Sequence, residues 1–358
     1  MADKKISQLT ELTSANAVTD FLPVVDTSVG ETKKITLANL PMSDAAIEQS
    51  YPYTTDFQSG TKQTRNLTSI TNSDGYYGNS NLTSVYVGSN VTSIGSNAFF
   101  YTNNLSSVII PDSVTSIGSQ AFFYNSSLSS ITIPDSVTSL GGYAFFSSGL
   151  TSVTLSNSLT SISLNTFYGC SSLTSIVIPD SVTSIGNGAF TNCSSLTSAT
   201  IGNGVTSIGS FAFNICASLT SIVIPNGVTS LGSYAFYGCT SLTSITIPDS
   251  VTSIQDGTFR ACSSLSSITI PNSITSIGNY AFTTCNSLTS VTIPSGVTSI
   301  GSVAFYGCAS LERINCLATT APTLGSTVFD GGILEEIHVP VGATYPATYG
   351  GLTVVFDL

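Results

Sequence analysis

The feature that most constrains this chain is a 23-residue period that is written ten times. The repeats begin at Leu82, Leu105, Leu128, Leu150, Leu173, Leu196, Leu219, Leu242, Leu265 and Leu288. Every step is 23 residues except the step from Leu128 to Leu150, which is 22. A fixed period in this range is typical of a solenoid, in which each repeat is stable only when it packs against its neighbours. The period therefore predicts one repeat array, where length alone would suggest two or three domains.

Apolar residues keep fixed offsets within each repeat. In the repeat that starts at Leu242, Ile245 and Ile247 follow three and five positions later, which predicts a strand with these side chains inward. Val251 and Ile254 then begin the return path. A phenylalanine closes each repeat: Phe99, Phe122, Phe145, Phe167, Phe190, Phe213, Phe236, Phe259, Phe282 and Phe305. We expect stacked repeats to bury these rings against one another as a spine.

Most of the cysteines follow the same period. Cys170, Cys193, Cys216, Cys239, Cys262, Cys285 and Cys308 are each 23 residues apart, and Cys316 stands alone. Equivalent side chains of stacked strands are parallel and about 4.8 Å apart, which is poor geometry for a disulfide. Earlier repeats have Thr102, Asn125 and Ser148 at this position, so it accepts small side chains. We expect buried free thiols and no zinc, because no C-x-x-C pair or histidine accompanies them.

Charge is scarce and unevenly placed. Only 8% of residues are charged, against roughly 25% in ordinary globular proteins. The net charge of −11 is carried mostly outside the repeats, and no basic stripe favours nucleic acid. No stretch approaches the roughly 18 apolar residues of a membrane span. The first residues lack the apolar run of a signal peptide, so we expect synthesis in a host cytoplasm without export.

The first 50 residues follow a different pattern. Apolar runs at 21–26 and 33–40 flank a turn that contains Gly30, which predicts a β-hairpin. A lone hairpin is marginal in water, so this segment is expected to contact a partner surface or copies of itself. The candidate contact residues are Ile6, Leu9, Leu12, Phe21, Leu22, Val24, Ile35, Leu37 and Leu40.

We divide the chain into four parts. Residues 1–50 are the attachment or oligomerisation segment, 51–81 the N-terminal cap, 82–310 the ten repeats, and 311–358 a degenerate repeat with a C-terminal cap. Within the first cap, residues 67–70 repeat the signature of the inward strand, and residues 76–81 match the later turns. Residues 334–340 are interpreted as the last strand.

Two surfaces of the array are candidates for ligand binding. The first is the fifth position of each repeat, on the outward face of the strands: Tyr86, Ile109, Thr132, Thr154, Val177, Thr200, Val223, Thr246, Thr269 and Thr292. The alternative is that Ser and Thr are there as uncharged, β-compatible residues. The second is an aromatic edge, one position after the spine: Phe100, Phe123, Phe146, Tyr168, Tyr237 and Tyr306. The alternative is ordinary packing between repeats.

Nothing in the chain indicates catalysis or a cofactor. His338 is the only histidine, and no recognisable nucleophile accompanies it. The acidic residues of the repeats, such as Asp135 and Asp180, follow a strand-ending proline, which is typical of turns. We therefore expect a protein that is not an enzyme and needs no metal or cofactor.

The repeats resemble the BspA-like class of leucine-rich repeats, whose units read L-x-x-I-x-I-P-x-x-V-x-x-I-x-x-x-A-F-x-x-C. The resemblance covers about residues 67–340 and implies a curved, β-rich parallel-sheet solenoid that binds proteins or glycans on cell surfaces. Residues 4–40 look like a leader found on structural proteins of tailed phages, including tail and head fibres. This second resemblance implies a virion-attachment or oligomerising segment.

The expected function is therefore a phage structural appendage, either a fibre or a capsid-decorating protein. Its N-terminal segment would bind other virion proteins, and its repeats would adhere to a host or environmental glycan or protein. A bacterial cell-surface adhesin of the BspA-like class is the alternative. Ice binding by regularly spaced threonines is a remote third, because the fifth position is too variable to match a lattice.

Overall fold

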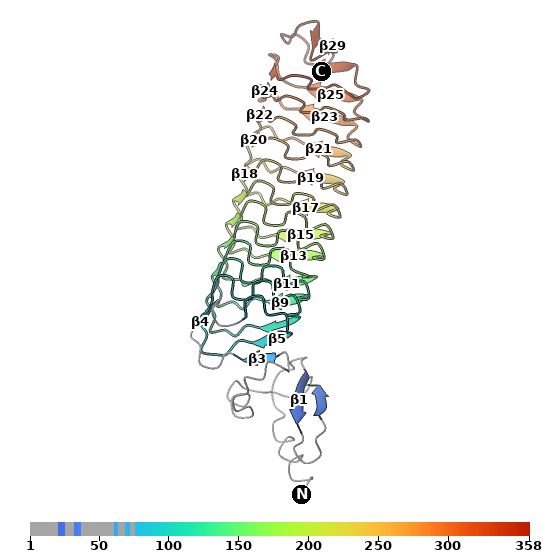
Figure 1. The fold of residues 1–358 in the computed structure, drawn as a ribbon. Helices are drawn as coiled ribbons and strands as arrows, with labels where there is room; N and C mark the ends of the chain where they lie inside the picture. The colour runs from blue at the N-terminus through green and yellow to red at the C-terminus, as the bar shows by residue number, and fades with distance from the viewer. Residues whose placement is uncertain (1–20, 26–31, 37–60, 64–68, 72–75) are drawn as a thin grey trace. The chain divides into compact units, whose positions relative to one another are not determined.

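The computed structural model describes residues 21–25, 32–36, 61–63, 69–71 and 76–358 (Figure 1). The chain forms two compact parts, Met1–Asp56 and Phe57–Leu358. In the first part, β1 (Phe21–Val25) pairs antiparallel with β2 (Thr32–Thr36). The predicted hairpin is thus confirmed. Of the candidate contact residues, Phe21, Leu22, Val24 and Ile35 lie on these strands, and Ile6, Leu9, Leu12, Leu37 and Leu40 lie outside the described residues.

The second part is a β-solenoid in which successive rungs add strands to two rows (Figure 1). The first row contains β3 (Thr61–Gln63), β5 (Ser84–Tyr86), β7 (Ser107–Ile109), β9 (Ser130–Thr132), β11 (Ser152–Thr154), β13 (Ser175–Ile178), β15 (Ser198–Ile201), β17 (Ser221–Val223), β19 (Ser244–Thr246), β21 (Ser267–Thr269), β23 (Ser290–Ile293), β25 (Arg313–Cys316) and β27 (Glu336–Val339). The rungs are about 23 residues apart, and the described residues contain no helix.

The second row consists of two-residue strands on the return path. They are β4 (Ser69–Ile70), β6 (Ser93–Ile94), β8 (Ser116–Ile117), β10 (Ser139–Leu140), β12 (Ser161–Ile162), β14 (Ser184–Ile185), β16 (Ser207–Ile208), β18 (Ser230–Leu231), β20 (Ser253–Ile254), β22 (Ser276–Ile277), β24 (Ser299–Ile300) and β26 (Thr323–Leu324). Paired rungs are parallel and in register, so that Ile245 lies beside Ile268 in the first row and Ile254 beside Ile277 in the second. The period thus places equivalent side chains in columns.

The phenylalanine spine is buried as expected. All ten rings are at most 1% exposed, and neighbouring rings stack with centroids 5.1 to 5.7 Å apart. Tyr76 and Phe329 extend the stack at its two ends. The inward leucines and isoleucines, including Leu242, Ile245 and Ile247, are also buried. Because a fully buried side chain of this size contributes roughly 1.5–3 kcal/mol, these columns hold the rungs together.

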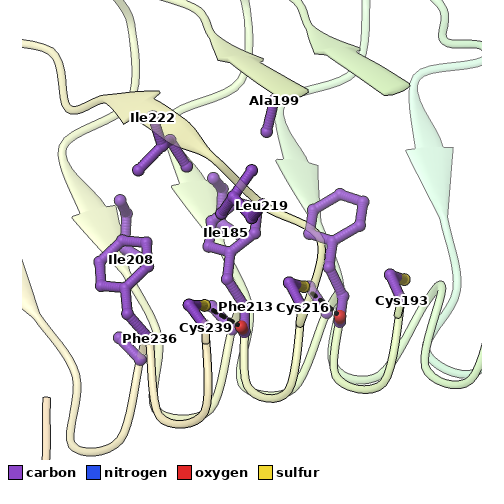
Figure 2. Packing of buried hydrophobic residues seen from close by; sticks show 14 of the residues in the cluster. Ile185, Cys193, Ala199, Ile208, Phe213, Cys216, Leu219, Ile222, Phe236 and Cys239 are labelled. Atoms are coloured by element: carbon purple, nitrogen blue, oxygen red, sulfur yellow. Dashed lines mark hydrogen bonds between the residues drawn. The ribbon is translucent and has the colours of Figure 1, made fainter. Parts of the chain in front are cut away.

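The cysteines are free and buried, which confirms the prediction. In each case the thiol donates a hydrogen bond to the main-chain oxygen of the spine phenylalanine one rung earlier, as Cys239 does to Phe213 at 3.2 Å (Figure 2). In the earlier rungs Ser148 donates to the oxygen of Phe122, and Asn125 to that of Phe99. The position therefore selects a small hydrogen-bond donor, a narrower requirement than small size alone.

A column of glycines follows the strands of the second row. A Cβ atom on Gly232 would lie 2.2 Å from the main-chain nitrogen of Ser210, and the same holds with similar distances along the column. Two rungs carry Ser163 and Gln255 here. The second row is interrupted at these two rungs, since its sheets end at β10 and β18 and resume at β12 and β20. A side chain at this position thus keeps adjacent rungs from approaching closely enough to pair.

Two sequence interpretations of the caps were wrong. Residues 67–70 were expected to form an inward strand, but β4 pairs with β6, so it belongs to the return path, and the first row starts at β3. The cause is that both strands of a repeat share an apolar-Thr-Ser-Ile signature. Residues 334–340 are not the last strand either. β29 (Leu352–Phe356) pairs parallel with β27 and antiparallel with β28 (Thr348–Tyr349).

The glycine column predicts the effect of a single methyl group. Gly232→Ala should lower the free energy of unfolding by about 1–3 kcal/mol, because its Cβ meets backbone that must move. Gly227→Ala is the matched control, since its Cβ would meet only oxygens at an ordinary 3.5 Å. Denaturant unfolding of both variants measures the difference. Equal effects of the two substitutions would contradict the account.

The thiol column predicts chemical inertness. Burial raises the pKa of Cys170, Cys239 and Cys308 to about 12, so the reactive thiolate is scarce at neutral pH. Iodoacetamide at pH 8 should leave the native cysteines unmodified and should modify all eight after unfolding in guanidinium. Mass spectrometry counts the adducts. Rapid modification of the folded chain would show that the rungs open.

Candidate functional site

The predicted aromatic edge contains one continuous run of stacked rings. Phe100, Phe123, Phe146 and Tyr168 stack in order, with centroids 4.7 Å apart, and Tyr77 extends the run at 5.0 Å from Phe100. We call these five residues the aromatic row. Tyr237 and Tyr306 do not join it, because Thr191, Asn214, Arg260 and Thr283 occupy the equivalent places in the intervening rungs.

The stacking limits what the aromatic row can bind. Adjacent ring planes differ by only 6° to 10°, so the faces cover one another and mainly the ring edges meet solvent. Packing between rungs and surface exposure therefore occur together. A sugar ring has little access to faces that are already paired.

A second set of aromatic residues lies beside the row, at positions that the sequence analysis missed. Each turn has a residue with positive φ two positions before the spine phenylalanine and another two positions after it; we call these the left-handed positions. Glycine occupies several of them, such as Gly188 and Gly257. Six aromatic residues occupy others with φ of 57° to 60°: Tyr101, Tyr124, Tyr143, Phe211, Tyr234 and Tyr280.

These six residues are held at a conformational cost. A left-handed backbone costs a non-glycine residue roughly 1–2 kcal/mol. Burial does not offset that cost fully, because Tyr101, Tyr124, Phe211 and Tyr280 are 38% to 43% exposed. Strained residues that remain at the surface are candidates for function. The sequence does carry a signal for them, since glycine and aromatic residues alternate at the same two offsets.

The outward face of the first row was the other candidate. Val177 and Val223 are 63% and 79% exposed, the threonines of the fifth position are exposed, and Tyr86 and Ile109 are half-buried. Threonines at the second position have a structural role, since Thr243 donates its hydroxyl to the main-chain oxygen of Thr220 one rung earlier. The exposed valines leave a small apolar minority on a hydroxyl-rich face.

The titratable residues of the array serve structural roles. Asp135 and Asp180 accept hydrogen bonds from the main-chain N–H groups of Asn157 and Asn203 in the next rung, as turn residues would. In the C-terminal cap, the Nδ1 atom of His338 lies 2.9 Å from both carboxylate oxygens of Asp357. Among the described residues no group of three or more His, Cys, Asp or Glu side chains could hold a metal ion. The same residues include no helix that is long and apolar enough to cross a membrane.

Comparison with known families places the repeats. A model described as a BspA type leucine rich repeat region, of six copies, matches residues 28–123, 68–197, 120–243 and 229–346. The chain belongs to the BspA-type leucine-rich repeat family. No curated protein matches it.

Solved structures show the same fold. A leucine-rich repeat protein from Bacteroides ovatus is 24% identical, with 96% of this chain and 100% of that chain covered and a TM-score of 0.59. The pneumococcal vaccine antigen PcpA is 20% identical, with 77% and 80% covered and a TM-score of 0.52. A leucine-rich cell surface protein from Faecalibacterium prausnitzii is 31% identical, with 67% and 75% covered and a TM-score of 0.41.

Two aromatic residues of one turn should behave oppositely on truncation. Phe122→Ala should cost about 3–5 kcal/mol, because it leaves a cavity in the spine. Tyr124→Gly should change the free energy of unfolding by less than about 1 kcal/mol. It removes a left-handed strain of about 1–2 kcal/mol and a stacked pair with Tyr101 worth about 0.5–1.5 kcal/mol.

Denaturant unfolding of the two variants under the same conditions provides the comparison. A loss of stability by Tyr124→Gly that approaches that of Phe122→Ala would show that Tyr124 is part of the structural core.

Proposed function

We propose that this chain is a non-catalytic adhesive protein whose repeats bind a host or environmental surface and whose N-terminal segment attaches it to a phage virion. The observation that carries the adhesive role is the set of six aromatic residues at left-handed positions. Glycine would relax the same backbone, and it does so in other rungs. Aromatic side chains kept there against strain are best accounted for by contact with a partner.

The solenoid suits adhesion through many weak contacts. Equivalent side chains recur at each rung in fixed register, so a polymeric or densely displayed partner meets the same surface several times. Linked contacts raise the effective concentration of each further contact, so overall binding exceeds that of one rung.

The virion placement is supported by the N-terminal segment. Residues 4–40 resemble the leader of tailed-phage appendages, and their hairpin β1–β2 has only two strands. A hairpin of this size gains stability from a partner. In this proposal the partner is another virion protein or a second copy of the chain.

The second candidate is a bacterial cell-surface adhesin, which the family of the repeats favours. An antibody against the full chain separates the two. Immunogold microscopy should label purified phage particles from the producing culture, and the chain should be found in those particles by mass spectrometry. Label on the bacterial envelope without label on particles would refute the virion placement and support the alternative.

Adhesion itself is tested with the full chain and a panel of intact bacterial cells in flow cytometry. The triple variant Tyr101→Asn, Tyr124→Asn and Tyr143→Asn should reduce cell binding about tenfold or more while the chain stays folded, because asparagine tolerates left-handed φ. Gln120→Asn, at an equivalent left-handed position, is the matched control and should leave binding unchanged. Undiminished binding by the triple variant would show that these residues do not carry adhesion.

A further inference from the structure

A single cation is clamped between aromatic rings on the same edge. The Cζ atom of Arg260 lies 5.6 Å from the ring centroid of Tyr237, one rung earlier, and 5.2 Å from that of Tyr280, one rung later. A guanidinium stacks well on aromatic faces because it is planar and weakly hydrated. Two rings on neighbouring rungs therefore restrict the orientation of this side chain.

The clamp is part of a larger aromatic cluster. Phe211 stacks on Tyr234 at 5.1 Å, and Tyr234 meets the edge of Tyr237 at 6.1 Å. Glycine at position 257 makes room for this arrangement, since a Cβ there would lie 2.2 Å from the Cε1 atom of Tyr234. Phe211 and Tyr280, at the two ends, are 43% and 38% exposed.

Arg260 has no charge partner in the part of the chain that the structure describes. The ion pairs found there are those of Asp357 with Arg313 and His338. Asp256, on the same turn as Arg260, accepts hydrogen bonds from the main chain and side chain of Asn279. Arg260 is also the only Lys or Arg between Leu82 and Ser310. The guanidinium is thus positioned by its neighbours without being neutralised.

We propose that Arg260, with Tyr237 and Tyr280, forms a subsite for an acidic polysaccharide, which rests on the proposed adhesive function and names its ligand class. The guanidinium binds a carboxylate or phosphate oxyanion through two parallel N–H groups. The exposed rings of Phe211 and Tyr280 contact the adjoining sugars. A polymer with one acid per repeating unit presents many equivalent ligands to one cation, which compensates for a weak single contact.

The test uses the folded full chain and three polymers in isothermal titration calorimetry. Polygalacturonate supplies carboxylates, a polyribitol phosphate teichoic acid supplies phosphates, and dextran is neutral. The chain should bind at least one acidic polymer and not dextran, and the affinity should fall between 0.05 and 0.5 M salt, concentrations of roughly the range over which screening becomes short-ranged. Whichever acidic polymer binds more tightly identifies the oxyanion.

Variants assign the binding to the clamp. Arg260→Gln should weaken acidic-polymer binding about tenfold or more, since charge-assisted hydrogen bonds are lost. Arg260→Lys should be intermediate, because it keeps the charge and loses the fork. Tyr280→Asn should weaken binding too, and asparagine already occupies the equivalent left-handed position at Asn165. Arg313→Gln, which removes a cation from the C-terminal cap, should bind like the unaltered chain.

Equal binding by Arg260→Gln and the unaltered chain would overturn the subsite, as would equal binding of dextran or of no polymer at all. Cell adhesion that survives Arg260→Gln but not the triple tyrosine variant would refute this subsite and leave the adhesive function in place. Thermal unfolding of each variant establishes that it is folded.

Discussion

The stacking of each spine phenylalanine on its counterpart in the next rung is the interaction on which the rest of the structure depends. Rings with centroids 5.1 to 5.7 Å apart can form an unbroken column only if every rung returns to the same place at nearly the same height. That requirement fixes the length of the repeat. The one 22-residue repeat obeys it as well, since Phe145 and Phe167 remain stacked at 5.4 Å. Its shortened turn contains Gly149, where a Cβ would lie only 2.0 Å from the oxygen of Ser126.

Two further columns adjust the fit between rungs. The thiols and their Ser or Asn counterparts donate hydrogen bonds to the spine oxygens, such as that of Phe213, that would otherwise have fewer partners in a dry interior. The glycines after the second-row strands let backbones approach, and Ser163 and Gln255 show what happens where glycine is missing. The interior therefore tolerates little variation. Variation is concentrated in the turns, where left-handed positions accept glycine, asparagine or strained aromatic residues.

The period made the interior predictable from sequence. A fixed offset determines which side chains share a column, so the spine, the buried thiols and the inward strands all followed from counting. The cap at residues 67–70 was misassigned because the two strands of a repeat carry nearly the same letters, and only pairing with β6 distinguishes them. The final strand β29 has no repeat signature, so periodicity gave no indication of it.

The surface was predictable only in part. The aromatic row follows one offset and was found, but the coverage of its faces depends on ring orientation, which letters do not show. The left-handed aromatic residues were missed because backbone φ cannot be read from a residue that can adopt either hand. The clamp on Arg260 joins three different offsets across three rungs, and such a contact is outside a one-column reading.

The most direct test of this account is to excise one complete repeat, Leu173–Ser195, from the full chain. If rung stacking organises the protein, Phe167 will stack on Phe213, and the shortened chain will retain its circular dichroism spectrum and unfold cooperatively near the original temperature. A deletion of residues 173–183 alone, which breaks the register, should abolish cooperative unfolding. If the complete excision unfolds the protein as severely as the partial one, the columns of equivalent residues are not what holds the rungs together.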